Sequence, residues 1–465
     1  MARNRLTPPP KADPSRTRTH MTPHSETTRQ TNEELAKRIL AIAGVPSPDD
    51  SLHEPAAVVL RDADAIVSHI EVNENHGVGV LLARMFSQYD NILSVRSKDF
   101  YEGRQTFGAA HICVSHGNAP RDQVFWNVLE GLRGSTVRRV LCVPYFPDDA
   151  LNAIALKELF GVPLCTWLMD DQNLTADGIP DSLMRELLAK STLRLAISPE
   201  LCEGYGLKYG YKMSFMPPLV STQFILPRVN QLPDAALRAK SAVIIGNIWG
   251  QRWLELLRPT VRDSGVTLRW YNNGEFRWLS CTKEALAGDG IFLQVGSRDP
   301  DERMVEILRQ APFVVVPSGV LDDTDDRRFI AQLSLPSRIP YILATSQAPI
   351  LVMGSPETAA ARFVTANGIG IVAPYDRQAF QDAVERISRP DVNLGLRRAA
   401  LLLALRFADI GGAEWLWQSL ARGEPVDTRY EEMLPRQKPD LSRLFARSAE
   451  ELQSAEPLTP PVSAS

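Results

Sequence analysis

Ser337 and Arg338 open a segment, LPSRIPYILATSQAPILVMG (335–354), that combines groups suited to holding an anion. The segment predicts a short helix starting near Arg338, followed by a buried strand. A serine hydroxyl, an arginine guanidinium and the free N–H groups of a helix start all donate hydrogen bonds, and together they match phosphate oxygens. An ordinary surface arginine is the alternative interpretation. The elements around the segment must decide between the two.

The stretch EVNENHGVGV (71–80) has similar potential. It follows a predicted strand and leads into an apolar helix, so Gly77 and Gly79 would leave bare N–H groups at a helix start, where anions are favoured. The stretch is not G-x-G-x-x-G and lacks the acidic residue expected further on, which gives a dinucleotide site little support. A tight turn that uses glycine only for its geometry is an equally good interpretation.

All seven histidines precede residue 117, so any imidazole acid–base chemistry must come from the first part of the chain. His76 and His116 lie at the ends of predicted strands and are catalytic candidates. His69 and His111 fall within predicted strands, where histidines are more often core residues. No pair of histidines has the spacing of a metal site.

Asp170, Asp171 and Asn173 directly follow the apolar run VPLCTWLM (162–169). Polar groups at the end of a buried strand suit the acceptor side of a site, where they could bind sugar hydroxyls. They could also bind a metal, or simply cap the next helix. Capping and function are equally good interpretations.

Asp322 and Asp323 belong to a second acidic stretch, VPSGVLDDTDDRR (316–328), after another predicted strand. Such a charge run usually marks a solvated loop. Its place at the end of a strand also makes the two residues candidates for a catalytic role.

Three further donors lie in SAVIIGNIWGQRW (241–253). Gly246 and Asn247 form a predicted turn after a strand, and Arg252 falls in the first turn of the following helix. These residues could help to bind a phosphate group.

Short apolar runs alternate with helical patterns over most of the chain, as in parallel sheets covered on both faces. The predicted strands of the first half are AIVSHI (65–70), NILSVRS (91–97), HICVSH (111–116), RRVLCVPYF (138–146), VPLCTWLM (162–169), LRLAIS (193–198) and MSFMPPLV (213–220). Those of the second half are SAVIIGN (241–247), VTLRWYN (266–272), IFLQVGS (291–297), PFVVVPS (312–318), APILVMG (348–354) and GIGIVAPY (368–375). We therefore expect an α/β protein with two tandem Rossmann-like, doubly wound domains facing a cleft, with ligands beyond the carboxyl ends of the strands.

The expected domains are a disordered tail (1–33), an N-terminal Rossmann-like domain (55–225), a C-terminal Rossmann-like domain (235–410), a helix that packs back on the first domain (411–423) and a Pro/Ser/Glu-rich tail (424–465). The first tail has a basic excess that would suit peripheral contact with an anionic membrane surface, although a solvated tail is the more common meaning.

Composition narrows the function classes. The chain has 465 residues, is 44% hydrophobic and carries a net charge of −4, which argues against a nucleic-acid binder. No apolar run has the length of a membrane span. The five cysteines are scattered and lack a C-x-x-C pair, so we expect buried thiols and a cytoplasmic protein.

The second half resembles glycosyltransferases of the two-Rossmann-domain type (GT-B), particularly family 4 and its relatives. Members carry P-S-K-x-x-E-Y-x-A-x-G-x-P-[IV] before a strand, and this chain has PSRIPYILATSQAPI. The resemblance places Ser337 and Arg338 beside the donor phosphates and Tyr341 near the ribose-binding acid. Tyr341 replaces the usual glutamate, and one extra residue precedes Pro349. The family's E-x7-E pair is thus absent in its standard form, and Asp322 and Asp323 are the nearest substitutes for its first acid.

The loop NENHGVGVL also resembles the family's glycine-containing loop, which reaches the donor phosphates. The resemblance implies transfer of a sugar from a nucleotide-diphosphate sugar to a hydroxyl of a polysaccharide or glycolipid acceptor. It also implies retained anomeric configuration, with neither a metal nor another cofactor.

Two other functions fit the same scaffold. A nucleotide-sugar 2-epimerase would need acids and histidines from both domains, and the second half has no histidine. A nucleotide-sugar-binding or scaffold protein with a degenerate site would explain Tyr341. A solute-binding protein of the periplasmic type is disfavoured by the lack of a signal sequence.

Overall fold

The computed structural model describes residues 52–73, 77–101, 103–175, 178–272, 281–295, 301–434 and 441. These residues belong to one compact unit, Asp49–Ser465. His76, the predicted tail 1–33 and the second tail beyond residue 434, apart from Leu441, lie outside them.

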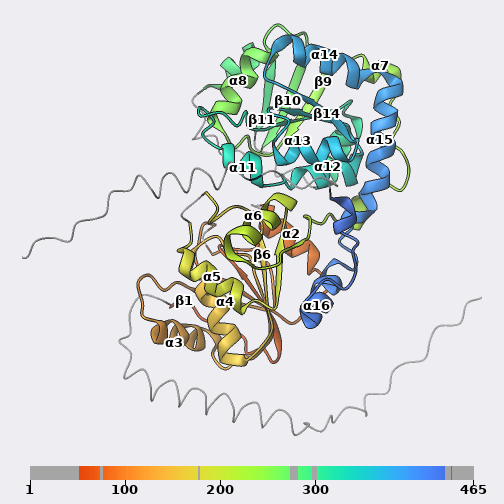
Figure 1. Cartoon of the computed structure of the whole chain (residues 1–465). Helices are drawn as coiled ribbons and strands as arrows, with labels where there is room; N and C mark the ends of the chain where they lie inside the picture. The colour runs from red at the N-terminus through yellow and green to blue at the C-terminus, as the bar shows by residue number, and fades with distance from the viewer. Residues whose placement is uncertain are drawn as a thin grey trace, which may run out of the picture. The chain divides into compact units, whose positions relative to one another are not determined.

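The N-terminal half contains an eight-stranded sheet in the order β1-β4-β3-β2-β5-β6-β7-β8 (Figure 1). Its strands are β1 (Leu52–Glu54), β2 (Ala63–Ser68), β3 (Ile92–Arg96), β4 (Ala110–Val114), β5 (Val137–Cys142), β6 (Leu164–Leu168), β7 (Leu193–Ala196) and β8 (Ser214–Phe215). All pairs are parallel except β1 with β4. Every residue of β2, β3 and β6 is buried, as expected for strands covered on both faces.

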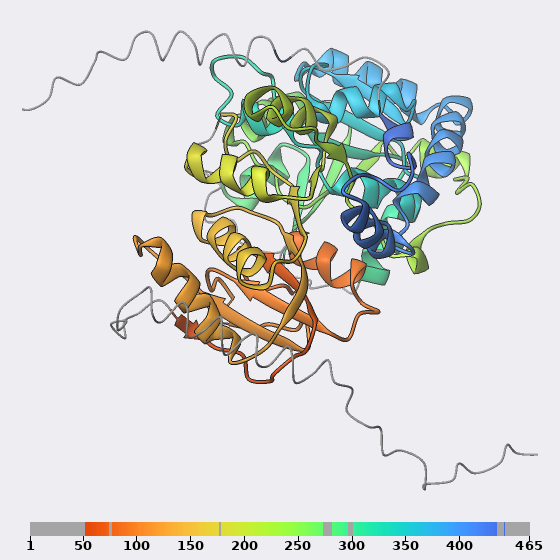
Figure 2. The ribbon, with the colours of Figure 1, turned by 60° about the horizontal axis from the view of Figure 1, so that its bottom comes forward.

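Helices follow the strands of this sheet. They are α2 (Gly77–Met85), α3 (Arg121–Leu132), α4 (Pro147–Phe160), α5 (Asp181–Lys190) and α6 (Pro199–Tyr209). Helices α3, α4 and α5 pack side by side (Figures 1 and 2). The N-terminus of α4 is stabilised because the carboxylate of Asp149 accepts hydrogen bonds from the N–H groups of Tyr145 and Phe146, at 2.9 and 2.8 Å.

The C-terminal half contains a wholly parallel six-stranded sheet in the order β11-β10-β9-β12-β13-β14. Its strands are β9 (Ser241–Ile245), β10 (Thr267–Asn272), β11 (Ile291–Val295), β12 (Val314–Pro317), β13 (Ile350–Met353) and β14 (Gly370–Ala373). The helices are α7 (Asp234–Leu237), α8 (Gln251–Val261), α9 (Lys283–Gly288), α10 (Asp301–Gln310), α11 (Arg328–Leu333), α12 (Arg338–Ser346), α13 (Ala359–Ala366), α14 (Arg377–Ser388) and α15 (Pro390–Ala404).

Two groups of helices cover this second sheet. Helix α8 packs against α14, while α12 contacts both α10 and α15 (Figure 1). The core between the sheet and its helices includes Trp253, Trp270, Phe313 and Phe380. The order strand–helix–strand therefore continues through the PSR segment, whose helix is α12 and whose strand is β13.

The chain returns to the N-terminal half after α15. It passes through a 3-10 turn, η2 (Leu405–Phe407), into α16 (Gly412–Arg422). In α16 the Trp417 ring lies 5.4 Å from the Phe86 ring and 4.2 Å from the guanidinium carbon of Arg139. Two further 3-10 turns are η1 (Thr222–Phe224) and η3 (Glu431–Met433).

The sequence predicted the six strands of the second half with ends within two residues of those observed, and it misplaced some strand ends of the first half by more. Strand β5 ends at Cys142 rather than at residue 146, because Pro144 cannot donate a ladder hydrogen bond. Strand β2 ends at Ser68, so the placement of His69 within a strand was wrong. Two prolines limit β8 to two residues. The antiparallel β1 was not predicted at all.

No helix of the described ranges is both long and apolar enough to span a bilayer.

Candidate functional site

Arg338, the first residue of α12, reaches back to the end of β9. Its Nη1 donates to the carbonyl oxygen of Ile245 at 2.8 Å, and its Nη2 donates to that of Asn247. Between them Gly246 has a φ of 71°, and a Cβ there would lie 3.7 Å from the guanidinium carbon. The three predicted donor-side residues Gly246, Asn247 and Arg338 are therefore in contact, and the positive φ of the turn favours glycine at position 246.

The guanidinium of Arg338 has no carboxylate partner among the described residues. Burial alone lowers its pKa to about 10, which still leaves it a cation at neutral pH. Two of its five N–H groups are used by the carbonyl oxygens, so others remain for a ligand. An arginine held in position but not neutralised is suited to an anion.

The start of α2 in the N-terminal half lies beside the residue that precedes this arginine. Gly77 begins α2, and a Cβ there would lie 3.8 Å from Oγ of Ser337, the residue before α12. Gly79 is buried within the same first turn. The structure thus brings together the two segments that the sequence singled out as anion sites, with two helix starts and one arginine at one place.

Arg84 strengthens the contact between these two helices. It lies in the last turn of α2, and its guanidinium carbon is 5.7 Å from the centre of the Tyr341 ring in α12. Sequence reasoning missed Arg84, because nothing in the sequence indicates that α2 and α12 are neighbours. Tyr341, which stands where the resemblance places an acid, contacts a cation through its ring.

Asp170 follows β6 at the edge of the N-terminal sheet. Its Oδ2 accepts a hydrogen bond from the Tyr145 hydroxyl at 2.6 Å, and the centre of the His69 ring lies 4.1 Å from that of the Tyr145 ring, with the two rings tilted by 33°. Burial raises the pKa of Asp170 to about 6, although the hydrogen bond from Tyr145 and the nearby hydroxyl of Ser334 favour the charged form. Asp170 has no cationic partner in the described chain.

Asp171 and Asn173, in contrast, build the loop after β6. Asp171 accepts the N–H groups of Asn173, Leu174 and Thr175, at 3.0, 2.7 and 2.9 Å. Asn173 donates to the carbonyl oxygen of Ile179. These hydrogen bonds within the loop give both residues a structural role. Asp170 is therefore the acid of this cluster that can face a ligand.

His116 occupies a buried site within the N-terminal half. Its Nε2 lies 2.8 Å from Oδ1 of Asn152, and its Nδ1 lies 3.4 Å from Nδ2 of Asn127. This pattern fits a neutral ring that donates from Nε2 and accepts at Nδ1. Burial lowers the pKa of His116, which also favours the neutral form. Its surroundings are those of a structural histidine.

The acidic loop after β12 divides into exposed and buried acids. Asp322 accepts from the N–H and hydroxyl of Thr324, at 2.9 and 2.7 Å, and Asp323, 80% exposed, pairs with Arg328. Asp325 is buried and accepts from Nε1 of Trp253 at 2.7 Å. The exposed pair has the environment of a solvated loop rather than that of catalytic acids.

Arg252 is tied to this loop. The N–H groups of Gln251 and Arg252 both donate to Asp326 at 3.2 Å, and Nε of Arg252 donates to Thr324 at 3.2 Å. Because the carboxylate of Asp326 already occupies the start of α8, an added phosphate there would meet a negative charge. The structure associates Arg252 with the acidic loop and not with Arg338.

No family model matches the sequence, and no curated protein matches it either. Solved structures do match. The trehalose-6-phosphate synthase OtsA superposes with a TM-score of 0.51 at 9% identity, over 78% of this chain and 100% of that chain. WaaG, a glycosyltransferase involved in lipopolysaccharide biosynthesis, gives 0.50 at 12% identity, over 76% and 97%. A UDP-forming α,α-trehalose-phosphate synthase from Burkholderia xenovorans gives 0.50 at 9%, over 77% and 100%.

The chain has the GT-B fold. Its two sheets, parallel apart from the β1–β4 pair, alternate with helices along the chain. At 9–12% identity the likeness establishes the fold and not the substrate.

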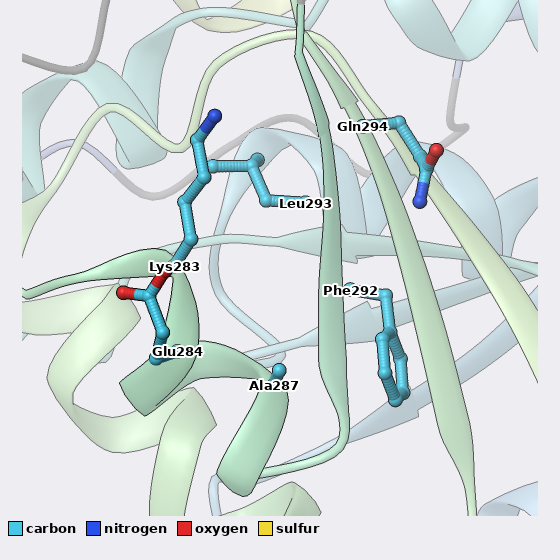
Figure 3. Close-up of a pocket in the computed structure, with 6 residues that line it drawn as sticks. All are labelled: Lys283, Glu284, Ala287, Phe292, Leu293 and Gln294. Atoms are coloured by element: carbon cyan, nitrogen blue, oxygen red, sulfur yellow. The ribbon is translucent and has the colours of Figure 1, made fainter.

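A separate pocket lies at the edge of the GT-B C-terminal sheet, with a volume of about 240 Å³. Lys283, Glu284 and Ala287 of α9 and three residues of β11 line it; Figure 3 shows Leu293 on the α9 side of the strand and Phe292 and Gln294 on the other. It shares no residue with the site around Arg338. In the described ranges, no group of three or more His, Cys, Asp or Glu side chains is placed to hold a metal ion.

Proposed function

We propose that the protein is a glycosyltransferase that moves a hexosyl group from a nucleotide-diphosphate sugar to a hydroxyl of a carbohydrate or lipid-linked acceptor. The observation that carries this proposal is the meeting of two helix starts around one unpaired guanidinium. Gly77 of α2 and Ser337 before α12 are neighbours, and Arg338 presents a charge that no carboxylate of the described residues neutralises. This arrangement suits a diphosphate.

In the proposed reaction the diphosphate is the leaving group. Negative charge builds on its oxygens as the bond from sugar to phosphate breaks, and the positive field of Arg338 and the two helix starts stabilises that charge. These groups are fixed before the donor arrives, because Arg338 is held by the carbonyl oxygens of Ile245 and Asn247. The field would thus supply the stabilisation that a metal ion gives elsewhere, and we propose a metal-independent, cofactor-free reaction.

Asp170 would orient the acceptor. A carboxylate at the edge of the N-terminal sheet can accept a hydrogen bond from the incoming hydroxyl. In a retaining transfer an oxygen of the leaving phosphate can take the acceptor proton, which removes the need for a strong protein base. We propose the retaining course on this ground and on the resemblance of the PSR segment.

One contact supports a second candidate, a nucleotide-sugar-binding protein without turnover. Tyr341 stands where the resemblance expects the ribose-binding acid, and its ring faces the guanidinium of Arg84. A site that has lost this acid could bind the diphosphate without holding the sugar in a reactive position.

A thermal-shift panel with UDP, GDP, ADP, CMP and their sugar conjugates tests the proposal. A ligand at about 100 times its Kd stabilises the folded state by about 2.7 kcal/mol. We expect one nucleoside diphosphate to raise the Tm of the wild type and not that of Arg338→Ala. The matched control is Arg389→Ala, which removes an exposed arginine of the same half.

Slow release of free sugar from the matching conjugate would favour the enzyme, and binding without any release would favour the binding protein. A panel without any shift would contradict both.

A further inference from the structure

Ser334 is a buried hydroxyl without a normal hydrogen bond. It lies between α11 and α12, four residues before Arg338, and is only 6% exposed. Its N–H donates to the carbonyl oxygen of Ile330 at 2.9 Å, but its Oγ has no hydrogen-bond partner among the described residues. Leaving a buried hydroxyl unsatisfied costs about 1–3 kcal/mol, so such a group points to something that completes it.

The carboxylate of Asp170, in the other half of the chain, is the acceptor that the Ser334 hydroxyl approaches. The Ser334 hydroxyl lies close enough to favour the charged form of Asp170, although the two do not reach normal hydrogen-bond geometry. The neighbouring residue fixes this approach, because the carbonyl oxygen of Leu333 accepts a hydrogen bond from Ser198 of the N-terminal half. Ser334 and Asp170 are thus held near each other but not joined.

The surroundings of Asp170 favour an uncharged polar ligand. Its Oδ2 already accepts from Tyr145, whose ring lies 4.1 Å from the His69 ring at an angle of 33° and places aromatic surface beside the carboxylate. A metal ion would need several acids, but Asp171 is used by the loop that it builds. A sugar ring has both a hydroxyl that can donate and an apolar face that can lie on a ring.

We propose that Asp170 and Ser334 together form a subsite for one hydroxyl of a carbohydrate acceptor. The sugar O–H donates to the free oxygen of the Asp170 carboxylate, and the same sugar oxygen accepts the hydrogen of Ser334 Oγ. The inference rests on the proposed glycosyltransferase function, because it names the acceptor side of that site. It identifies Ser334 as a residue that positions the acceptor.

The subsite takes one side chain from each half of the chain. Ser334 belongs to the same short segment as Ser337 and Arg338, so a sugar that bridges Asp170 and Ser334 also fixes the start of α12. The acceptor hydroxyl would then be held within the same segment that holds the donor phosphates. We expect acceptor and donor to strengthen each other's binding for this reason.

The test uses simple neutral glycosides as probes, namely the methyl α- and β-glycosides of glucose, galactose and mannose, followed by saturation-transfer NMR on the full chain. We expect at least one glycoside to bind the wild type. Ser334→Ala should weaken it about fivefold, as the loss of one neutral hydrogen bond predicts, and Asp170→Asn about tenfold or more. Ser334→Thr, which keeps the hydroxyl, should bind better than Ser334→Ala.

Ser388→Ala is the matched control. Ser388, at the end of α14, also has a buried hydroxyl without a partner, and its loss should leave glycoside binding unchanged. The Tm of each variant, measured in the same samples, separates a local effect from unfolding. Equal affinity in Ser334→Ala and the wild type would overturn the inference, as would a wild type that binds none of the glycosides.

The two proposals fail separately. If no nucleoside diphosphate binds but a glycoside does so in a Ser334-dependent way, the transferase is contradicted and the hydroxyl subsite stands. If a nucleoside diphosphate binds and Ser334→Ala has no effect on glycosides, the transferase stands and the subsite is contradicted.

Discussion

Two sets of charged residues can be compared between the two halves of the chain. One set forms an ion pair and the other does not. Glu200 of α6 and Arg362 of α13 form an ion pair, with Nε of Arg362 donating at 3.1 Å to a carboxylate that is almost fully buried. Asp170 is likewise an acid of the N-terminal half and Arg338 a cation of the C-terminal half, yet neither has an ion-pair partner in the described ranges. Glu200 and Arg362 satisfy each other's charge, whereas Asp170 and Arg338 keep charges that are available to ligands.

Breaking the paired contact should give the largest effect. Arg362→Ala leaves the Glu200 carboxylate buried and alone, which should lower the free energy of unfolding by about 3–5 kcal/mol in urea titrations. Burial already raises the pKa of Glu200, so protonation should relieve part of the loss at acidic pH. The control is Arg389→Ala, whose exposed pair with Asp391 should contribute no more than about 1 kcal/mol. A similar loss in both variants would contradict the distinction.

Removing the unpaired cation should mainly affect a ligand. Arg338→Ala should weaken binding of the nucleoside diphosphate by about 1.5–3 kcal/mol, which is roughly a 10- to 150-fold rise in Kd, because a charge-assisted contact is lost. Arg338→Lys keeps the charge but cannot donate to Ile245 and Asn247 at once, so its affinity should fall between the two. Isothermal titration calorimetry measures the affinity of the wild type and of both variants. An unchanged affinity for Arg338→Ala would remove Arg338 from the site.

The unpaired acid should make stability and acceptor binding respond to pH in opposite directions. Burial raises the pKa of Asp170 from 3.8 to about 6, so the folded chain binds protons more tightly than the unfolded chain. The stability that Asp170 contributes is therefore present at low pH and is lost as pH rises through about 6. Acceptor binding needs the carboxylate and should instead be lost as pH falls below about 6.

Asp170→Asn isolates this response. Urea unfolding and glycoside binding, each measured at pH 5 and pH 7, should depend less on pH in the variant than in the wild type. Asp149, whose pKa burial also raises to about 6, remains in both proteins and sets the residual dependence of stability. Identical pH profiles for variant and wild type would show that Asp170 titrates elsewhere.

The smallest effect is expected in the acidic loop. Asp323→Asn removes an exposed partner of Arg328 and should change the free energy of unfolding by less than about 0.5 kcal/mol. Nucleoside-diphosphate affinity should not change. Loss of sugar transfer in this variant would restore the acidic loop as a source of catalytic acids and would break the contrast between paired and unpaired groups.

The sequence predicted the alternation of strands and helices well, because apolar runs and turn residues are local features. The same local features identified Gly77 and Arg338, and the structure places their segments side by side. Ser334 and Arg84 could not be found in this way. Their significance comes from contacts with residues far away in the chain, and no local pattern encodes such contacts.

Tyr145 and His69 were missed for a different reason. Each was assigned to a strand that in fact ends before it, at Cys142 and Ser68. A shift of one to three residues at a strand end moves a side chain from the core to the edge of the sheet, where ligands bind. Pro144 was a usable signal for the first of these ends.

The two passages of chain between the halves are joined to each other. Val220 on the outgoing passage donates its N–H to the carbonyl oxygen of Phe407 at 2.7 Å and accepts the N–H of Asp409 at 2.9 Å on the returning passage. Asp409 also accepts from the N–H and hydroxyl of Thr222, at 2.9 and 2.7 Å. The two halves are therefore linked by two hydrogen-bonded segments and not by a single free linker. Two joined passages of chain resist rotation of one half against the other more than a single connection would.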